Sequence, residues 1–408
     1  MGVNRFFNRV FNIPNLSLRY QLHTNPNFNT DLTMRNLFYT LFIALGFACL
    51  GCTKAYHLPA PQSVKPAPAT VITNFTLKDA DTAYTAFNTY FYNPTAKLYY
   101  NATDKSGTGA IWTQAIYWDL AMDVYERTKS PAQLTMVNDI YTGGANQYDN
   151  YNWNNQTTWF IYDDMMWWVT ALARANQLTG NAAYLQNSIA GFNHVWAGSY
   201  DPVDGGMFWD FQHSGKNACI NYPTVIAAVR LYQITKDTSY LAKAKSIYAW
   251  SKANLFNTTN GEVADHKIGN NPPGYQDYTY NQGTAIGAAV MLYKVTNDAA
   301  YLADAKLAAD YTQNGMCVDG ILPAEGDFNE QGVLKAIFAQ YIMMLINDGG
   351  QKQYLTWIQK NVKTGWTNRD KARNLTYRNY AVACPTGIIQ SYEASSVVTF
   401  MQICPPSE

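Results

Sequence analysis

Two adjacent acids, Asp163 and Asp164, are the side chains best placed to do chemistry. They lie within WFIYDDMMWW (159–168), where two charges among apolar side chains are costly unless they are paired or functional. Neighbouring helix residues point about 100° apart, so two such carboxyl groups can flank a bound sugar at the roughly 5 Å typical of retaining glycosidases. Mutual repulsion should raise one pKa, which leaves one carboxylate and one carboxylic acid near neutral pH. The alternative is a pair that caps a helix N-terminus.

The segments before several apolar helices have the composition of a binding rim. They are rich in Gly, Asn, Asp and aromatic residues, and they span 107–114, 152–164, 201–221, 269–283 and 323–332. The turns at the other ends of these helices are short. This asymmetry predicts a ligand groove on the face that carries the long loops.

Eight further residues on this face are candidates for contact with substrate. They are Trp112, Gln114, Trp209, Lys216, Asn217, Tyr280, Asn281 and Gln282. The aromatic rings offer stacking faces, and the polar groups offer hydrogen bonds to hydroxyl groups. Core packing or helix capping is the competing interpretation for each of them. Gly205 and Gly206 would let the backbone approach a ligand, whereas the run 165–168 is expected in the core.

A recurring segment indicates how these residues are positioned. LTGNAAYLQNSIAGF (178–192), ITKDTSYLAKAKSIY (234–248) and VTNDAAYLADAKLAADY (295–311) each read as a helix end, a polar turn and a new helix. Weaker copies extend the repeat to six helical hairpins over residues 71–408. Each hairpin has a longer apolar helix, expected at 110–128, 157–178, 218–234, 281–295, 329–346 and 380–402. We therefore predict an all-α (α/α)6 toroid, with an open superhelical array as the alternative.

Composition limits the classes of function. The 408 residues carry a net charge of zero, which gives no electrostatic basis for binding nucleic acid or an anionic membrane surface. The 31 Tyr and 11 Trp suit a large core and equally suit a neutral sugar ligand. The five His form no zinc pattern, and no metal or other cofactor is expected. Among the later cysteines, a disulfide such as Cys384–Cys404 is possible.

The N-terminus has the pattern of an export signal. Arg35 precedes an apolar run, 37–50, which is too short to span a bilayer and ends at Gly51 and Cys52. This pattern predicts a lipoprotein-type signal peptide at 34–52, with Cys52 as the lipidated residue. Residues 1–33 would then be an extension that results from a misassigned start codon. A plain cleaved signal is the alternative. Residues 53–70 are Pro-rich and read as a tether. We expect an outer-membrane lipoprotein, on the periplasmic face or the cell surface, that meets the membrane only through its lipid anchor.

The chain resembles the family 76 glycoside hydrolases, which are endo-α-1,6-mannanases. The resemblance rests on YDDMMWWVTALARANQLTG (162–180), DGGMFWDF (204–211) with KNACIN (216–221), YTYNQGTAIGAAVMLY (278–293) and FNEQGVLKAIFAQYI (328–342). It implies the (α/α)6 fold and retaining hydrolysis of α-mannan poly- or oligosaccharides without a cofactor, by a monomer. It makes Asp163 the nucleophile and Asp164 the general acid/base. The family usually has Phe-Lys-Gly-Ile-Phe where this chain has LKAIF (334–338), which puts the distal subsites in question.

Two other classes of function compete with this interpretation. A non-catalytic glycan-binding lipoprotein could use the same toroid. A lyase, epimerase or uronide hydrolase would call on His, Arg or Lys side chains, for which the candidates are Lys216, Lys335 and His213.

Overall fold

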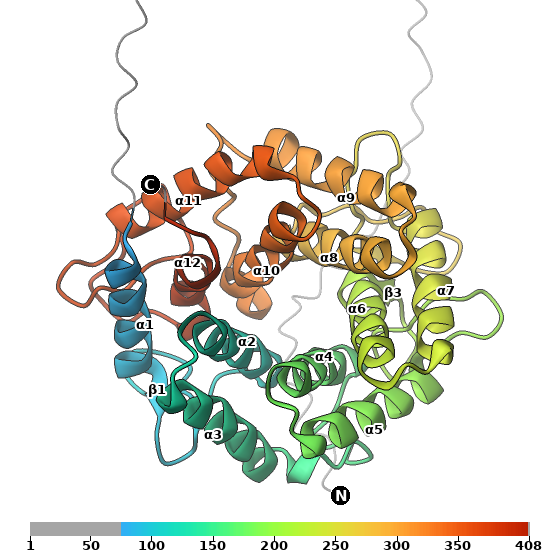
Figure 1. The fold of residues 1–408 in the computed structure, drawn as a ribbon, viewed down its shortest axis with the longest axis horizontal. Helices are drawn as coiled ribbons and strands as arrows, with labels where there is room; N and C mark the ends of the chain where they lie inside the picture. Colours follow the sequence, from blue (N-terminus) through green and yellow to red (C-terminus); the bar gives the residue numbers. More distant parts are fainter. Residues whose placement is uncertain (1–74, 407–408) are drawn as a thin grey trace, which may run out of the picture. The chain divides into compact units, whose positions relative to one another are not determined.

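The structure is a computed structural model that describes residues 75–406. The predicted signal peptide, Cys52 and the tether lie outside these residues. Helices of an inner ring alternate along the chain with helices of an outer ring (Figure 1). The inner helices are α2 (Ile111–Thr128), α4 (Tyr162–Thr179), α6 (Ala218–Thr235), α8 (Thr279–Thr296), α10 (Leu334–Asn347) and α12 (Ser391–Ile403). The outer helices are α1 (Leu77–Phe91), α3 (Pro131–Gln147), α5 (Ala182–Ser199), α7 (Thr238–Asn254), α9 (Ala299–Tyr311) and α11 (Leu355–Thr367).

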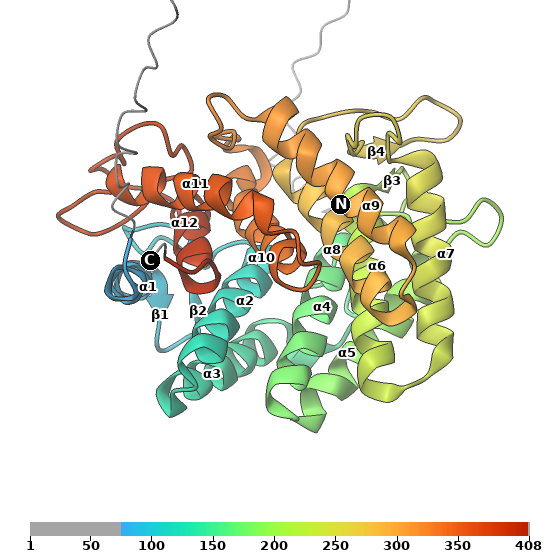
Figure 2. The same cartoon turned by 45° about the horizontal axis from the view of Figure 1, so that its top comes forward.

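The inner ring is closed. Each inner helix contacts the next, and α12 contacts α10 on one side and α2 on the other. The closure can be followed in Figure 2, where the last helix returns to the first hairpin. An open array would leave α2 and α12 apart, so the predicted (α/α)6 toroid is confirmed.

The recurring sequence segment forms one turn geometry. In the copy at 179–181, the Thr179 hydroxyl donates to the Ala175 carbonyl and accepts from the Asn181 amide at 3.2 Å. Gly180 is left-handed with φ 72° and ends α4, and the Asn181 side chain caps α5. The same Thr contacts recur at Thr128, Thr235 and Thr296. The turn chemistry explains why the repeat could be recognised in the sequence.

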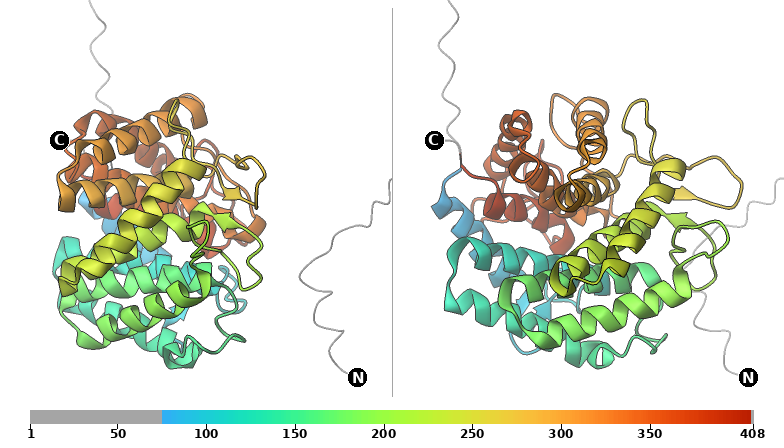
Figure 3. Two further views of the ribbon diagram at one scale, coloured as in Figure 1. Left: turned by 90° about the vertical axis from the view of Figure 1, so that its right-hand side faces the viewer. Right: turned by 45° about the vertical axis from the view of Figure 1, so that its right-hand side comes forward.

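The connections differ sharply between the two ends of the ring. Inner-to-outer turns are short, at 129–130, 180–181, 236–237, 297–298 and 348–354, the last including η5 (Lys352–Tyr354). Outer-to-inner loops are long, at 92–110, 148–161, 200–217, 255–278, 312–333 and 368–390. Figure 3 shows long loops gathered at one end of the helices. The expected asymmetry is confirmed, and we call the long-loop end the front.

The front loops contain the remaining regular structure of the described residues. β1 (Tyr92–Asn93) pairs with β2 (Leu98–Tyr99), and β3 (Lys216–Asn217) pairs with β4 (His266–Lys267), both antiparallel. The helical turns are η2 (Asp149–Tyr151), η3 (Thr312–Met316) and η4 (Phe328–Val333). Three inner helices begin later than predicted. Helix α12 begins late because Pro385 and Gly387 keep residues 380–390 irregular. Helix α10 begins late because Asn329 and Glu330 have left-handed backbone conformations. Helix α4 begins at Tyr162.

The core lies between the two rings. Trp118 of α2 packs edge-on against Tyr184 of α5 at 5.6 Å and lies 5.8 Å from Trp168 of α4. All of 165–168 is buried, as predicted. Cys384 and Cys404 are both free thiols, so the suggested disulfide is not formed in the structure. Within residues 75–406, no helix has the length and apolar character needed to cross a membrane.

Candidate active site

The acid pair lies in the first turn of an inner helix at the front. Asp163 and Asp164 are the second and third residues of α4, and the Asp163 amide donates to the Trp209 carbonyl at 3.2 Å. The residue at the N-cap is Ile161, which makes no side-chain capping bond. The first-turn position therefore places both carboxyl groups near the positive end of the helix dipole without using them as caps.

Asp163 faces α6 and the loop before α8. Its Oδ1 is buried and accepts no hydrogen bond from any residue between 75 and 406. Burial raises the pKa of Asp163 to about 6; contacts with Cys219 and Trp167 oppose the rise, and the charge of Asp265 adds to it. Near neutral pH this side chain is mostly a carboxylate with an unused acceptor atom.

Asp164 lies about 100° further around α4 and is 9% exposed. Burial raises its pKa well above the ordinary value, and the charges of Asp163 and Glu330 raise it further. We expected the pKa of one acid to rise, whereas the pKa values of both acids are raised. A raised pKa suits Asp164 to donate a proton beside the Asp163 carboxylate, which is the combination that acid-assisted nucleophilic displacement requires.

Glu330 is part of this site and was missed in the sequence. It lies in η4 with φ 55°, and its Oε2 accepts a hydrogen bond from Trp112 Nε1 at 3.1 Å. The sequence signals were its place in the polar loop 323–332 and in the segment 328–342 that resembles the family. The charge of Glu330 therefore contributes to the rise in the pKa of Asp164.

Asp265 is the second missed acid. Its Oδ1 accepts from Asn281 Nδ2 at 3.1 Å, and its Oδ2 lies 3.0 Å from His266 Nδ1. Asn281 was predicted to contact substrate, but it is fully buried and its amide orients Asp265. The signal that could have found Asp265 is an Asp-His pair in a loop on the same face as Asp163.

Aromatic rings adjoin the acid pair. The ring centroid of Trp167 lies 6.3 Å from that of Trp112 and 6.4 Å from that of Tyr280. Trp167 is nearly buried, whereas Trp112 and Tyr280 are half-buried. The structure therefore brings two predicted stacking residues together with Asp163, which Trp167 contacts.

Two predicted binding residues have structural roles instead. Gln114 is fully buried, and its amide accepts from the Tyr99 amide at 2.8 Å and donates to the Tyr99 carbonyl at 3.0 Å. Gln282 accepts from the Val263 amide at 2.7 Å and donates to the carbonyls of Gly261 and Ala308. Both amides are used in holding backbone segments, so neither is available to a sugar.

Lys216 is also committed within the protein. Its Nζ donates to Asp201 Oδ2 and to the Gly205 carbonyl, each at 2.6 Å, and it lies over the Phe208 ring. These contacts hold the loop 200–217 rather than a ligand. Lys335 likewise pairs with Glu325 at 3.3 Å and is fully buried. Lys216 and Lys335 are two of the candidate cations for a lyase or epimerase reaction, and both are engaged within the protein.

The same loop positions Trp209 and Asn217. Trp209 is half-buried, and its Nε1 donates to Ser214 Oγ at 2.8 Å. Asn217 is half-buried in β3, next to the start of α6. Both remain candidates for substrate contact. Gly206 does not serve a ligand, since a Cβ there would lie 2.5 Å from the Trp250 ring.

The described residues contain no cluster of three or more His, Cys, Asp or Glu that could hold a metal ion. His213, the remaining candidate for other sugar chemistry, stacks on Phe208 with centroids 4.2 Å apart.

The sequence model of glycosyl hydrolase family 76 matches residues 76–403, and the chain belongs to this family. It is a glycoside hydrolase by that membership. No curated protein matches the chain significantly.

Solved structures agree with this assignment. An α-1,6-mannanase from Salegentibacter sp. HEL1_6 is 26% identical, with a TM-score of 0.74 over 80% of this chain and 98% of that one. An inactive variant of that enzyme, with two consecutive aspartates replaced by alanine, is in complex with α-1,6-mannotetrose and has a TM-score of 0.73 at 25% identity, over the same shares of the two chains. A family 76 mannosidase from Bacteroides thetaiotaomicron, 17% identical, shares the fold with a TM-score of 0.68 over 80% of this chain and 96% of that one.

Proposed function

We propose that the protein is a retaining, endo-acting α-1,6-mannanase with Asp163 as nucleophile and Asp164 as general acid/base. The observation that carries the proposal is the pair of adjacent acids in the first turn of α4, where the pKa of Asp163 is raised to about 6 and that of Asp164 is raised well above its usual range. The similarity to an α-1,6-mannanase whose inactive variant lacks two consecutive aspartates supports the same assignment.

The proposed reaction has two steps. Asp163 attacks the anomeric carbon of a mannose unit while Asp164 donates its proton to the oxygen of the departing sugar, so that the glycosidic bond breaks and a glycosyl ester forms. Asp164, now a carboxylate, takes a proton from water. That water attacks the anomeric carbon, releases Asp163 and gives a product with the starting α configuration.

The rings beside the acids would hold the sugar chain. Trp112 and Tyr280 are half-buried and next to Trp167, a position suited to stacking on the apolar face of a mannose unit. Trp209 would add a stacking face, and Asn217 could bond to hydroxyl groups. Charge plays little part in this recognition because the substrate is neutral.

Product analysis on linear α-1,6-mannan tests the proposal. The wild type should release several oligosaccharide sizes early, and NMR should show the α anomer first. Asp163→Asn and Asp164→Asn should each lose activity by about a thousandfold or more, which corresponds to about 4 kcal/mol of transition-state stabilisation. Asp237→Asn is a matched control, because Asn replaces Asp equally well at the N-cap of α7.

Three results would contradict parts of the proposal. Binding of intact mannan without new reducing ends would indicate a non-catalytic glycan-binding protein. Initial release of the β anomer would indicate inversion. Mannose as the sole early product would indicate exo action.

We also propose that Cys52 anchors the protein to the outer membrane. The proposal rests on the apolar run 37–50 followed by Gly51 and Cys52. Radioactive palmitate should label the wild-type protein and not Cys52→Ser. A wild-type protein that is exported without label would instead indicate a plain cleaved signal.

A further inference from the structure

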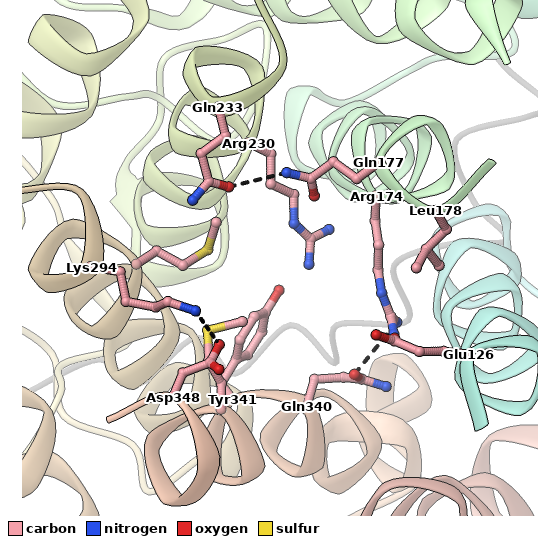
Figure 4. A pocket seen from close by; sticks show the side chains of 12 residues that line it. Glu126, Arg174, Gln177, Leu178, Arg230, Gln233, Lys294, Gln340, Tyr341 and Asp348 are labelled. Carbon is pink, nitrogen blue, oxygen red and sulfur yellow. Dashed lines mark hydrogen bonds and ion pairs between the residues drawn. The ribbon is translucent and has the colours of Figure 1, made fainter. Parts of the chain in front are cut away.

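A pocket lies at the opposite end of the ring from the acid pair. It has a volume of about 310 Å³ and is lined by the last turns of α2, α4, α6, α8 and α10 (Figure 4). At 1.5 Å of helix rise per residue, Arg174 lies roughly 16 Å along α4 from Asp163. We call it the rear pocket. The proposed hydrolysis uses none of its residues.

Most charged side chains around the rear pocket form ion pairs within the protein. Arg174 pairs with Asp119 at 3.2 Å, with Asp123 at 2.5 Å and with Glu126 at 3.2 Å. Lys294 and Asp348 pair at 2.9 Å. Three acids thus share the single charge of Arg174, whereas Lys294 and Asp348 balance each other.

Arg230 is the exception. It is 6% exposed, and its Nη1 donates to the Thr170 carbonyl at 2.8 Å. Among residues 75–406 it has no acidic partner, and its other N–H groups meet no acceptor. Figure 4 shows the guanidinium directed into the pocket. The C-termini of the inner helices converge here and favour a cation. They supply no acceptor atom to the Arg230 guanidinium beyond the Thr170 carbonyl.

Neutral polar groups surround this cation. Gln177 and Gln233, which share a hydrogen bond of 3.0 Å, lie on one wall, and Gln340 lies on another. The Tyr341 hydroxyl points into the same space (Figure 4). Burial raises the pKa of Tyr341 to about 12, so the hydroxyl remains a donor at neutral pH. Gly287 leaves room for the Tyr341 ring, which a Cβ at that position would overlap.

We propose that the rear pocket binds a small hydroxylated monocarboxylate of the sugar-acid class. The carboxylate pairs in bidentate fashion with Arg230, and the hydroxyl groups bond to Tyr341 and to the amides of Gln177 and Gln233. A single negative charge is the most that this site accepts, because Asp119, Asp123 and Glu126 share the one charge of Arg174 and would repel a phosphate dianion. The volume lies at the lower end of ligand pockets, roughly 300–1,000 Å³.

Titration calorimetry with D-glucuronate tests this site without using catalysis. D-Glucose is the matched ligand without a carboxylate, and acetate is the carboxylate without hydroxyl groups. Glucuronate should bind with one site per chain, at least tenfold more tightly than glucose or acetate. Arg230→Gln should weaken binding at least tenfold and Tyr341→Phe several-fold, whereas Asp163→Asn should bind glucuronate as the wild type does.

Each other outcome overturns the proposal. If glucose bound as tightly as glucuronate, Arg230 would have no role in binding. If acetate bound as tightly as glucuronate, the hydroxyl groups would have none. Loss of binding in Asp163→Asn would place the ligand in the front site. Absence of saturable binding would show that the pocket holds only solvent. Circular dichroism shows whether Arg230→Gln folds. If it does not fold, Tyr341→Phe, which removes only one oxygen, takes its place. Unchanged affinity for glucuronate in Tyr341→Phe would then overturn the proposal.

Discussion

Trp112 Nε1 donates a hydrogen bond to Glu330 Oε2 at 3.1 Å, which joins the first inner helix to the loop before α10. The contact fixes an acidic side chain near the acid pair, and the charge of Glu330 raises the pKa of Asp164. A residue outside the proposed chemical steps thereby helps to keep the proposed acid protonated.

Removing this charge should move the alkaline limb of the pH profile. In Glu330→Gln the amide oxygen can still accept from Trp112, but the pKa of Asp164 should fall because a neighbouring negative charge is gone. The acid form is then lost at lower pH, so the alkaline limb of kcat/KM should shift to lower pH. Asp327→Asn, an exposed acid of the same loop, is the control and should leave the limb in place. An unmoved limb in Glu330→Gln would show that this charge does not act on Asp164.

The acid limb should report Asp163. Because its pKa is about 6, kcat/KM should rise as the pH increases through that value and the nucleophile loses its proton. Asp265→Asn removes a charge that raises this pKa, so the limb should move to lower pH. A wild-type limb at the pKa of an exposed carboxyl group, or a limb that Asp265→Asn leaves in place, would contradict the assignment.

Gln282 should matter for stability. Gln282→Ala leaves the Val263 amide and two carbonyls without their partner, which should lower the free energy of unfolding by about 2–4 kcal/mol. The urea midpoint measures this loss, and Gln353→Ala, an exposed glutamine of η5, is the control. Wild-type stability with a raised KM would instead indicate a role in binding sugar.

Two glycines separate backbone strain from close packing. Gly206 has φ 75° and lies against Trp250, whereas Gly107 has φ 70° and open space around its Cα. Gly107→Ala should cost about 1–2 kcal/mol from φ alone. Gly206→Ala should cost more, because its Cβ also meets the indole. Equal losses in thermal unfolding would show that the Trp250 contact adjusts freely.

The sequence carried enough information for the ring and for the acid pair. Thr179, Gly180 and Asn181 make local turn contacts, and local contacts leave a repeating pattern in the sequence. Asp163 and Asp164 stood out because charge is rare among apolar residues. Glu330 and Asp265 did not stand out, since irregular loops bring them to the site and loop conformation follows no period.

The sequence also could not predict the direction in which a polar side chain points. Gln114 and Gln282 lie near the starts of inner helices, where a binding residue would also lie. Their amides turn to backbone segments that the sequence does not place beside them. Residue type and helix position are the same for both roles, so only the fold distinguishes them.

Trapping the covalent intermediate tests the central claim most directly. A fluorinated mannosyl substrate slows breakdown of the glycosyl ester, and mass spectrometry of the acid-quenched protein then identifies the labelled side chain. We expect one mannosyl group per chain, with peptide fragmentation placing it on Asp163. A label on Asp164 or another residue, or turnover without any adduct and with the β anomer released first, would contradict the proposed nucleophile.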